Sequence, residues 1–100
     1  MESVKYLVEV RWGEVFIMQL VVIKETEKTY FIDQKKGKDI VRHSYISSRV
    51  SKNNSVFNTL KEALSFGVEK AKDEVAKAEA SLLKKNTYLT ELKDMLNKEL

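Results

Sequence analysis

Residues 59–100 read TLKEALSFGVEKAKDEVAKAEASLLKKNTYLTELKDMLNKEL, and this stretch decides the fold. It contains no proline, and Gly67 is its only glycine, a residue that weakens a helix by about 1 kcal/mol relative to alanine. Thr59 and Glu62 have the spacing of a capping box, in which each side chain bonds a backbone N–H that the first helical turn leaves unpaired. The stretch therefore predicts one long helix that begins just after Thr59.

Apolar residues in this predicted helix recur with the heptad spacing of a coiled coil. The a positions hold Val68, Val75, Leu82, Leu89 and Leu96, and the d positions hold Leu64, Ala71, Ala78, Lys85, Leu92 and Glu99. The a column is consistently apolar, whereas Lys85 and Glu99 interrupt the d column. We call six of these residues the apolar stripe and predict that they form an oligomer interface: Val68, Val75, Leu82, Leu89, Leu92 and Leu96.

The predicted helix is too long for the rest of the chain to cover. A helix of about 40 residues spans about 60 Å, whereas a strand of about seven residues spans about 23 Å. Three arrangements would cover the far part of the stripe. The helix pairs with its copy in a second chain, or it breaks near Lys85-Asn86-Thr87 and folds back, or it meets a different partner. We favour a homodimer formed by the C-terminal helix and leave open whether its helices run parallel or antiparallel.

Residues 1–57 have a period near two instead, which is typical of strands. Alternating apolar residues predict one half-buried face of a first strand, with Leu7 out of pattern: Val4, Tyr6, Val8, Val10 and Trp12. Gly13 supplies a turn, and residues 15–23 are apolar on both faces, which indicates a central strand covered on both sides. Shorter strands are indicated at 29–32, 39–43 and 55–57.

Together these patterns predict an α+β fold. Residues 1–57 form a four- or five-stranded antiparallel sheet or a small SH3-like barrel, and one long C-terminal helix follows in residues 58–100. The two parts are expected to make one structural domain.

The composition excludes several classes of function. The 100 residues include no cysteine and one histidine, so the chain offers no thiolate zinc site, cysteine nucleophile or multi-histidine metal site. Its three glycines are isolated, so it has no glycine-rich phosphate loop. We interpret His43, which has Asp39 nearby, as a surface histidine at the end of a strand. The sequence therefore predicts a protein that is not an enzyme and that needs no metal or cofactor.

The longest apolar stretch, residues 15–23, is far shorter than the ~20 residues of a membrane-spanning helix. The start Met1-Glu2-Ser3 is acidic and lacks the hydrophobic region of a signal peptide. We therefore expect no contact with a membrane and a cytoplasmic location.

The formal net charge of +3 lies entirely in residues 1–57, because the helix is balanced. Basic residues concentrate in one segment, residues 35–52, which lies among the aromatic residues Tyr30, Tyr45 and Phe57. This mixture binds phosphates and stacked bases. The segment supports an alternative function as a nucleic-acid-binding protein, with five candidate contact residues: Lys35, Lys36, Lys38, Arg42 and Arg49.

Trp12 lies next to the predicted turn at Gly13. It either caps the core of its own sheet or serves as an anchor for a partner, since tryptophan is a favoured anchor at protein interfaces. A chain with surplus apolar surface and without catalytic groups works by binding. We therefore predict a non-enzymatic macromolecule-binding protein.

Two strings, VIKETEKTYFI at 22–32 and VFNTLKEA at 56–63, resemble short proteins of bacteriophages and prophages of Gram-positive bacteria. Those proteins are similar in combining a small sheet with a charged, coiled-coil-like helix. The resemblance implies a dimeric inhibitor or modulator of a host protein or defence complex, a class that includes anti-CRISPR proteins. It also implies that the partner is a host protein or nucleoprotein complex in the cytoplasm of the host bacterium. The resemblance transfers no site residues.

Overall fold

Six strands and one long helix follow one another in the computed structural model, which describes residues 2–99. The elements are β1 (Ser3–Arg11), β2 (Glu14–Glu25), β3 (Thr29–Ile32), β4 (Lys38–Val41), β5 (Arg49–Ser51), β6 (Ser55–Phe57) and α1 (Leu60–Glu99). Every ladder between described strands is antiparallel. The α+β prediction is therefore confirmed, with one more short strand than the four or five expected. The predicted ranges 1–57 and 58–100 also include positions 1 and 100, which lie outside the described residues.

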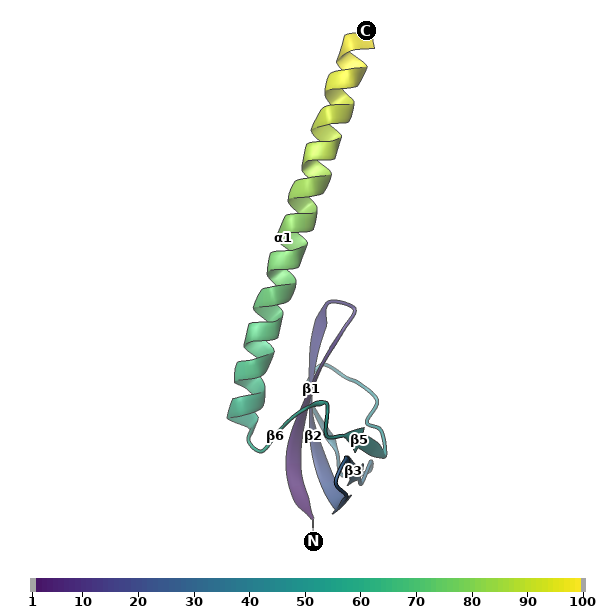
Figure 1. Cartoon of the computed structure of the whole chain (residues 1–100), viewed down its shortest axis with the longest axis vertical. Helices are drawn as coiled ribbons and strands as arrows, with labels where there is room; N and C mark the ends of the chain where they lie inside the picture. Colours follow the sequence, from purple (N-terminus) through teal and green to yellow (C-terminus); the bar gives the residue numbers. More distant parts are fainter. Residues whose placement is uncertain (1, 100) are drawn as a thin grey trace.

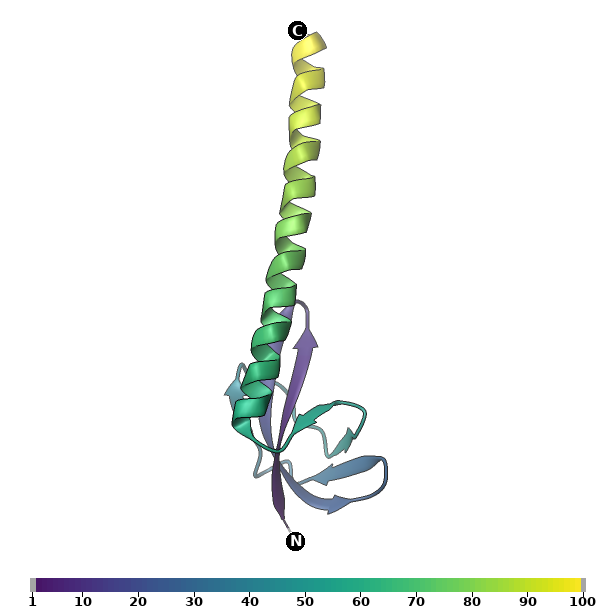
Figure 2. The ribbon, with the colours of Figure 1, turned by 60° about the vertical axis from the view of Figure 1, so that its left-hand side comes forward.

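β2 is the centre of a sheet with the order β5-β3-β2-β1-β6. β1 pairs with β2 along its whole length, and on its other side β2 pairs with β4 near its start and β3 near its end. The register shifts near Ile17 and between Val22 and Lys24, and such irregularities bend a strand. Figure 2 shows the resulting curled sheet beside the lower end of α1. Within the described chain no ladder joins the end strands β5 and β6, so the sheet is curled but not closed into a barrel.

Both faces of β2 are buried, as its run of apolar residues predicts. One face contributes to the main core inside the curl, which consists of Leu7, Phe16, Met18, Leu20, Val22, Ile32 and Val50. The opposite face packs against the helix, where Val8 and Ile17 contact Ala63 of α1. The strand thus separates two apolar layers, one within the sheet and one between the sheet and the helix.

The buried face predicted for β1 is only partly right. Leu7, the residue out of pattern, is 4% exposed and belongs to the main core. Val4 and Val10 lie on the face predicted to be buried, yet both are exposed. The physical reason is that α1 crosses only the middle of this face, whereas the curled sheet encloses the other one.

The start of α1 confirms one half of the predicted capping box, the bond to Thr59, whereas the Glu62 carboxylate bonds the Thr59 hydroxyl and not a backbone N–H. The backbone N–H of Glu62 donates to Thr59 Oγ1 at 3.2 Å, and the Thr59 hydroxyl donates to the Glu62 carboxylate at 2.9 Å. Ala63 and Gly67, one turn apart, are the buried residues of the helix, and they bring its backbone close to the sheet.

Beyond the sheet, α1 projects alone (Figure 1). Every residue from Val75 to Glu99 is exposed, a stretch that spans about 37 Å of helix. The chain measures 74 × 23 × 22 Å and has a radius of gyration of 20.5 Å, against about 13 Å for a compact chain of this length. The sheet therefore covers less than half of the helix.

The helix does not break at Lys85-Asn86-Thr87, so the folded-back hairpin is not the observed arrangement. Thr87 Oγ1 donates to the carbonyl of Leu83 at 3.1 Å, and Thr90 Oγ1 donates to the carbonyl of Asn86 at 3.0 Å. These hydroxyls bond back to the preceding turn instead of capping a new helix. The helix is consequently continuous through the whole apolar stripe.

Candidate interaction surfaces

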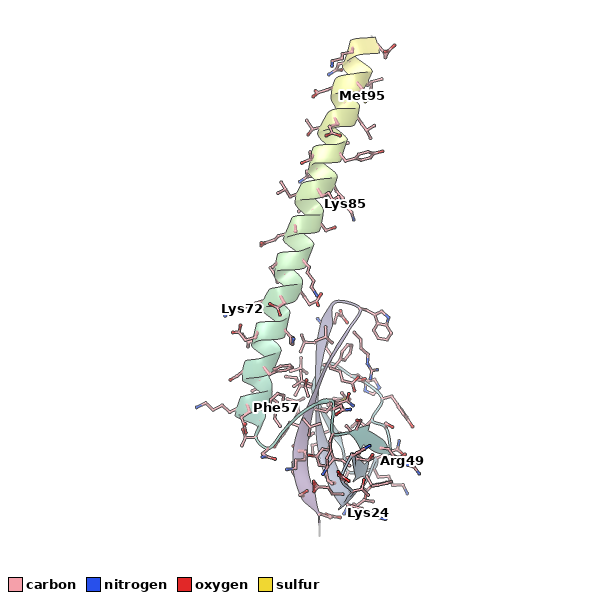
Figure 3. The ribbon with its side chains drawn as sticks, in the orientation of Figure 1. Lys24, Arg49, Phe57, Lys72, Lys85 and Met95 are labelled. Atoms are coloured by element: carbon pink, nitrogen blue, oxygen red, sulfur yellow. The ribbon has the colours of Figure 1, made fainter. Side chains whose placement is uncertain are left out.

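The apolar stripe lies on one face of α1 and is open to solvent. Its six residues are between 46% and 61% exposed, and three of them lie in the projecting part beyond Lys85. Lys85 and Met95 mark this part of the helix in Figure 3, far from the sheet. No described residue outside the helix covers the stripe beyond Ala78, so the length argument from the sequence holds for the single chain.

The lower part of the stripe forms one wall of an apolar groove. Its helix wall consists of Leu64, Gly67, Val68 and Ala71, and its sheet wall consists of Val15, Ile17 and Val41. The groove has a volume of about 190 Å³. All seven residues that line it lack polar side chains, so the groove suits an apolar side chain.

The groove continues toward the β1–β2 turn as a wider depression of about 450 Å³. Val75 and Ala78 extend the helix wall there, while Glu14, Arg42 and Glu74 place charged groups at its mouth. Arg42 Nη1 lies 3.5 Å from Glu14 Oε1. The sequence did not predict the sheet wall of the groove, because nothing local to β2 or β4 indicates which stretch of helix they face.

Trp12 occupies the tip of the β1–β2 hairpin and is 87% exposed. The turn holds two residues between the paired Arg11 and Glu14, and both have positive φ: 52° at Trp12 and 75° at Gly13. This is the pattern of a type I′ turn, whose first position favours asparagine, aspartate or glycine. A bulky side chain with positive φ is a conformational outlier. Trp12 therefore does not cap the core, although its ring makes an edge contact with Phe16 at 6.5 Å between centroids.

The five basic residues predicted to contact nucleic acid are spread over several places. Lys36 pairs with Glu2, and Arg42 pairs with Glu14 beside the groove. Lys35 lies in the turn before β4, and Lys38 is the first residue of β4. Arg49 lies on β5, where it pairs with Phe31 of β3. The basic segment of the sequence thus divides among a turn, the strand β4 with the residue after it, and β5.

Arg49 instead meets a basic residue that the sequence analysis missed. Its guanidinium lies 5.4 Å from the centre of the Phe31 ring, and the ammonium of Lys24 lies 5.5 Å from the same ring. Figure 3 shows Lys24 and Arg49 at the end of the sheet that is remote from the projecting helix. The residues come together because β3 pairs with both β2 and β5, a long-range pairing that the sequence pattern did not disclose.

Lys52 makes a similar contact on the opposite face of β3, where its ammonium lies 5.1 Å from the centre of the Tyr30 ring. It also donates a hydrogen bond of 2.6 Å to the Glu25 carboxylate, which holds the pKa of Glu25 below its usual range. We call Lys24, Arg49 and Phe31 the basic-aromatic patch.

His43 and Asp39 form an exposed pair, with 2.7 Å between His43 Nδ1 and Asp39 Oδ2. This hydrogen bond, assisted by the backbone N–H of Ser44, holds the pKa of Asp39 below its usual range. Ser44 is nearly buried, and its hydroxyl accepts a bond of 3.3 Å from Arg11. Between residues 2 and 99 no serine or threonine hydroxyl is hydrogen-bonded to His43, so the pair is not arranged to activate a nucleophile.

Neither a metal site nor a membrane-spanning helix is found among the described residues. No three His, Asp or Glu side chains among them come together as a metal site requires. No helix in that part of the chain combines the length and the apolar character needed to cross a bilayer.

The chain was also compared with known proteins. No protein-family model, no curated protein and no solved structure matches it.

Proposed function

We propose that this protein is a non-enzymatic binding protein that works as a homodimer through α1. The observation that carries the proposal is the exposed apolar stripe on a helix that projects beyond its own sheet. Monomeric proteins rarely leave a continuous apolar surface of this extent uncovered. Full burial of a leucine or valine side chain contributes about 1.5–3 kcal/mol, so covering six half-exposed ones favours association strongly.

A second copy of the chain supplies a matching cover for such a stripe. The heptad repeat of α1 is the pattern that packs against another helix of the same period, with a and d side chains inserted between four residues of the partner. The helix is also electrically balanced, with eight lysines and eight acidic residues in 58–100. Two copies therefore approach without net repulsion.

The hairpin tip is the surface that we assign to a different protein. Trp12 is exposed at a position where the turn favours a small polar residue, and strained residues of this kind cluster at functional sites. An exposed tryptophan on a rigid hairpin is a suitable anchor for a pocket on a partner. The dimer thus acts as an inhibitor or modulator of the protein that it binds. The phage-type, anti-defence role implied by the resemblance stays a prediction, as does the cytoplasmic location.

Sedimentation velocity over a range of concentrations tests the proposed self-association. We expect a dimer for the parent and a monomer for a variant with Leu89→Ser and Leu96→Ser, whose fold is retained because neither residue touches the sheet. Leu83→Ser is the control, since Leu83 is a leucine outside the stripe that is more exposed than Leu89 and Leu96. A parent that stays monomeric at high micromolar concentration would contradict the proposal.

Nucleic-acid binding is the second candidate function, and the basic-aromatic patch favours it. Arg49 and Lys24 approach one aromatic ring at a sheet end, and single-strand-binding proteins combine basic and aromatic side chains of this kind. We expect charge reversal at Lys24 and Arg49 to abolish binding if this candidate is right, and charge reversal at Lys35, Lys36 and Lys38 to weaken it less. Absence of binding at about 50 mM salt, where phosphate contacts are strong, would rule it out.

A further inference from the structure

We propose that the two chains pair antiparallel, with residues 82–96 of each α1 seated in the groove between α1 and the sheet of the other chain. The inference rests on the proposed function, because it specifies the geometry of that self-association. Its support comes from residue sizes along the stripe, from the position of Lys85 and from the shape of the groove.

Residue sizes favour an antiparallel register centred on residue 80. In that register Ala71 faces Leu89 and Ala78 faces Leu82, so each small side chain of one helix meets a large one of the other. The outer layers pair Val68 with Leu92 and Leu64 with Leu96. A parallel dimer would instead place each alanine opposite its own copy, which leaves two layers underfilled.

The position of Lys85 also favours an antiparallel dimer over a parallel one. It occupies a d position, and in a parallel dimer the two Lys85 ammonium groups would face each other within the interface, where like charges repel strongly. The antiparallel register puts Lys85 opposite Val75, between Glu74 and Glu79 of the second chain. Each lysine then has acidic neighbours within reach while its methylene groups cover the valine.

The charged residues at the e and g positions beside the stripe also favour the antiparallel dimer, though less than Lys85 does. A parallel dimer would bring Glu74 close to Glu79 of the other chain twice, because these residues occupy the facing g and e positions. The antiparallel register brings Glu79 close to its own copy once, across the two-fold axis. Antiparallel pairing therefore has fewer like-charge approaches, although it does not remove them all.

The groove also explains why apolar residues at the g positions of the heptad repeat are exposed only in the far half of α1. Tyr88 and Met95 occupy g positions there and are exposed. In the near half the g positions are Leu60 and Gly67, which lie against the sheet, and Glu74, which lies against the hairpin turn, so none of the three is exposed. Since g columns of two antiparallel helices lie on the same side of the pair, Tyr88 and Met95 of one chain point toward the sheet of the other.

Each of these two side chains comes level with a part of the groove that suits its chemistry. Met95 comes level with Gly67, where the groove is lined by Val15, Ile17 and Val41 and suits a flexible apolar side chain. Tyr88 comes level with Glu74, at the charged mouth, where its hydroxyl finds polar partners. A parallel dimer would leave the groove empty and direct Tyr88 toward Lys93 instead.

Disulfide trapping tests the geometry, and the chain offers a clean background because it contains no cysteine. We would make Val75→Cys and Lys85→Cys as separate full-length variants, one of them carrying a mass tag, and oxidise each alone and in an equimolar mixture. The two positions face each other across the antiparallel pair, close enough for a disulfide. In a parallel pair each faces its own copy, and positions 75 and 85 lie about 15 Å apart along the axis.

We expect little cross-linking of either variant alone and a mixed, singly tagged dimer as the main product of the mixture. Asp73→Cys mixed with Lys85→Cys is the control, since position 73 lies on the outer face of the helix. Cross-linking of each variant with itself, or no cross-linking of a species that sediments as a dimer, would overturn the antiparallel geometry and leave the self-association standing. A monomer in sedimentation would overturn both.

Discussion

A Cβ atom on Gly67 would lie 3.0 Å from Cδ1 of Ile17, closer than carbon atoms normally approach. The helix thus approaches β2 so closely that a side chain at position 67 would require Ile17 to shift. Ile17 is 2% exposed, and its side chain also lines the apolar groove. Gly67 has a low helix propensity, but its lack of a side chain lets the helix pack closely on the sheet.

Gly67→Val should lower the free energy of unfolding by about 1–3 kcal/mol, the usual effect of overpacking a well-filled contact. Chemical denaturation followed by circular dichroism measures the change. Ala80→Val is the matched control on the exposed part of α1, where valine costs only its lower helix propensity, about 0.7 kcal/mol or less. Equal effects at the two positions would show that the close approach to Ile17 does not matter.

Substitutions at Trp12 separate the strain of the turn from its contact with Phe16. Both Trp12→Asn and Trp12→Ala lose the ring contact, but only asparagine tolerates the positive φ of a type I′ turn. We therefore expect Trp12→Asn to unfold with a free energy about 1 kcal/mol higher than Trp12→Ala. Thermal and urea denaturation of the two variants decide the matter, and an alanine variant as stable as the asparagine variant would contradict it.

Lys85→Leu should tighten the dimer at least tenfold, about 1.4 kcal/mol, because a lysine at a d position limits how much of the interface can be buried. Sedimentation equilibrium gives the dissociation constants. Lys84→Leu serves as control, since Lys84 precedes it on the outer face and adds the same apolar volume away from the stripe. A dimer no tighter for Lys85→Leu than for Lys84→Leu would place the interface elsewhere.

The Asp39–His43 pair makes a prediction about pH. The hydrogen bond from His43 lowers the pKa of the Asp39 carboxyl in the folded chain. Such a contribution to stability is present above the carboxyl's unfolded pKa, about 3.9, and is lost as the pH falls through the lower folded value. His43→Ala should therefore raise the pKa of Asp39 toward its ordinary value.

Carbon-detected NMR titration of the Asp39 carboxyl measures this shift directly. Tyr45→Phe should leave the Asp39 pKa in place, because the Tyr45 hydroxyl bonds Gln34 and not Asp39. An Asp39 pKa that is the same in the parent and in His43→Ala would show that the hydrogen bond does not form in solution.

The parts of the fold that follow from local pattern were predictable from the sequence. The capping pair Thr59 and Glu62, the absence of proline and the heptad repeat indicate α1, and the two-sided apolar run identifies β2 as the central strand. Each of these signals is contained within a few neighbouring residues.

What the sequence did not show depends on pairing between distant segments. The burial of Leu7, the meeting of Lys24 with Arg49, and the sheet wall at Val41 all follow from how the sheet curls and where α1 crosses it. The exposure of Trp12 could not be predicted for a related reason, since a residue beside a turn can face either the core or solvent. The stripe was predictable as a surface, but the groove that completes it was not.

The packing of Ala63 and Gly67 on the sheet also has a mechanical consequence. These contacts fix how the helix is rotated about its own axis, and a continuous helix carries that rotation to Leu89 and Leu96, about 33–44 Å away. One residue inserted after Gly67 would turn the far part of the stripe by about 100° while leaving its local structure intact. An insertion of about seven residues would restore its direction to within about 20°. The sheet thus sets the direction in which the far part of the stripe faces, although it does not contact that part within its own chain.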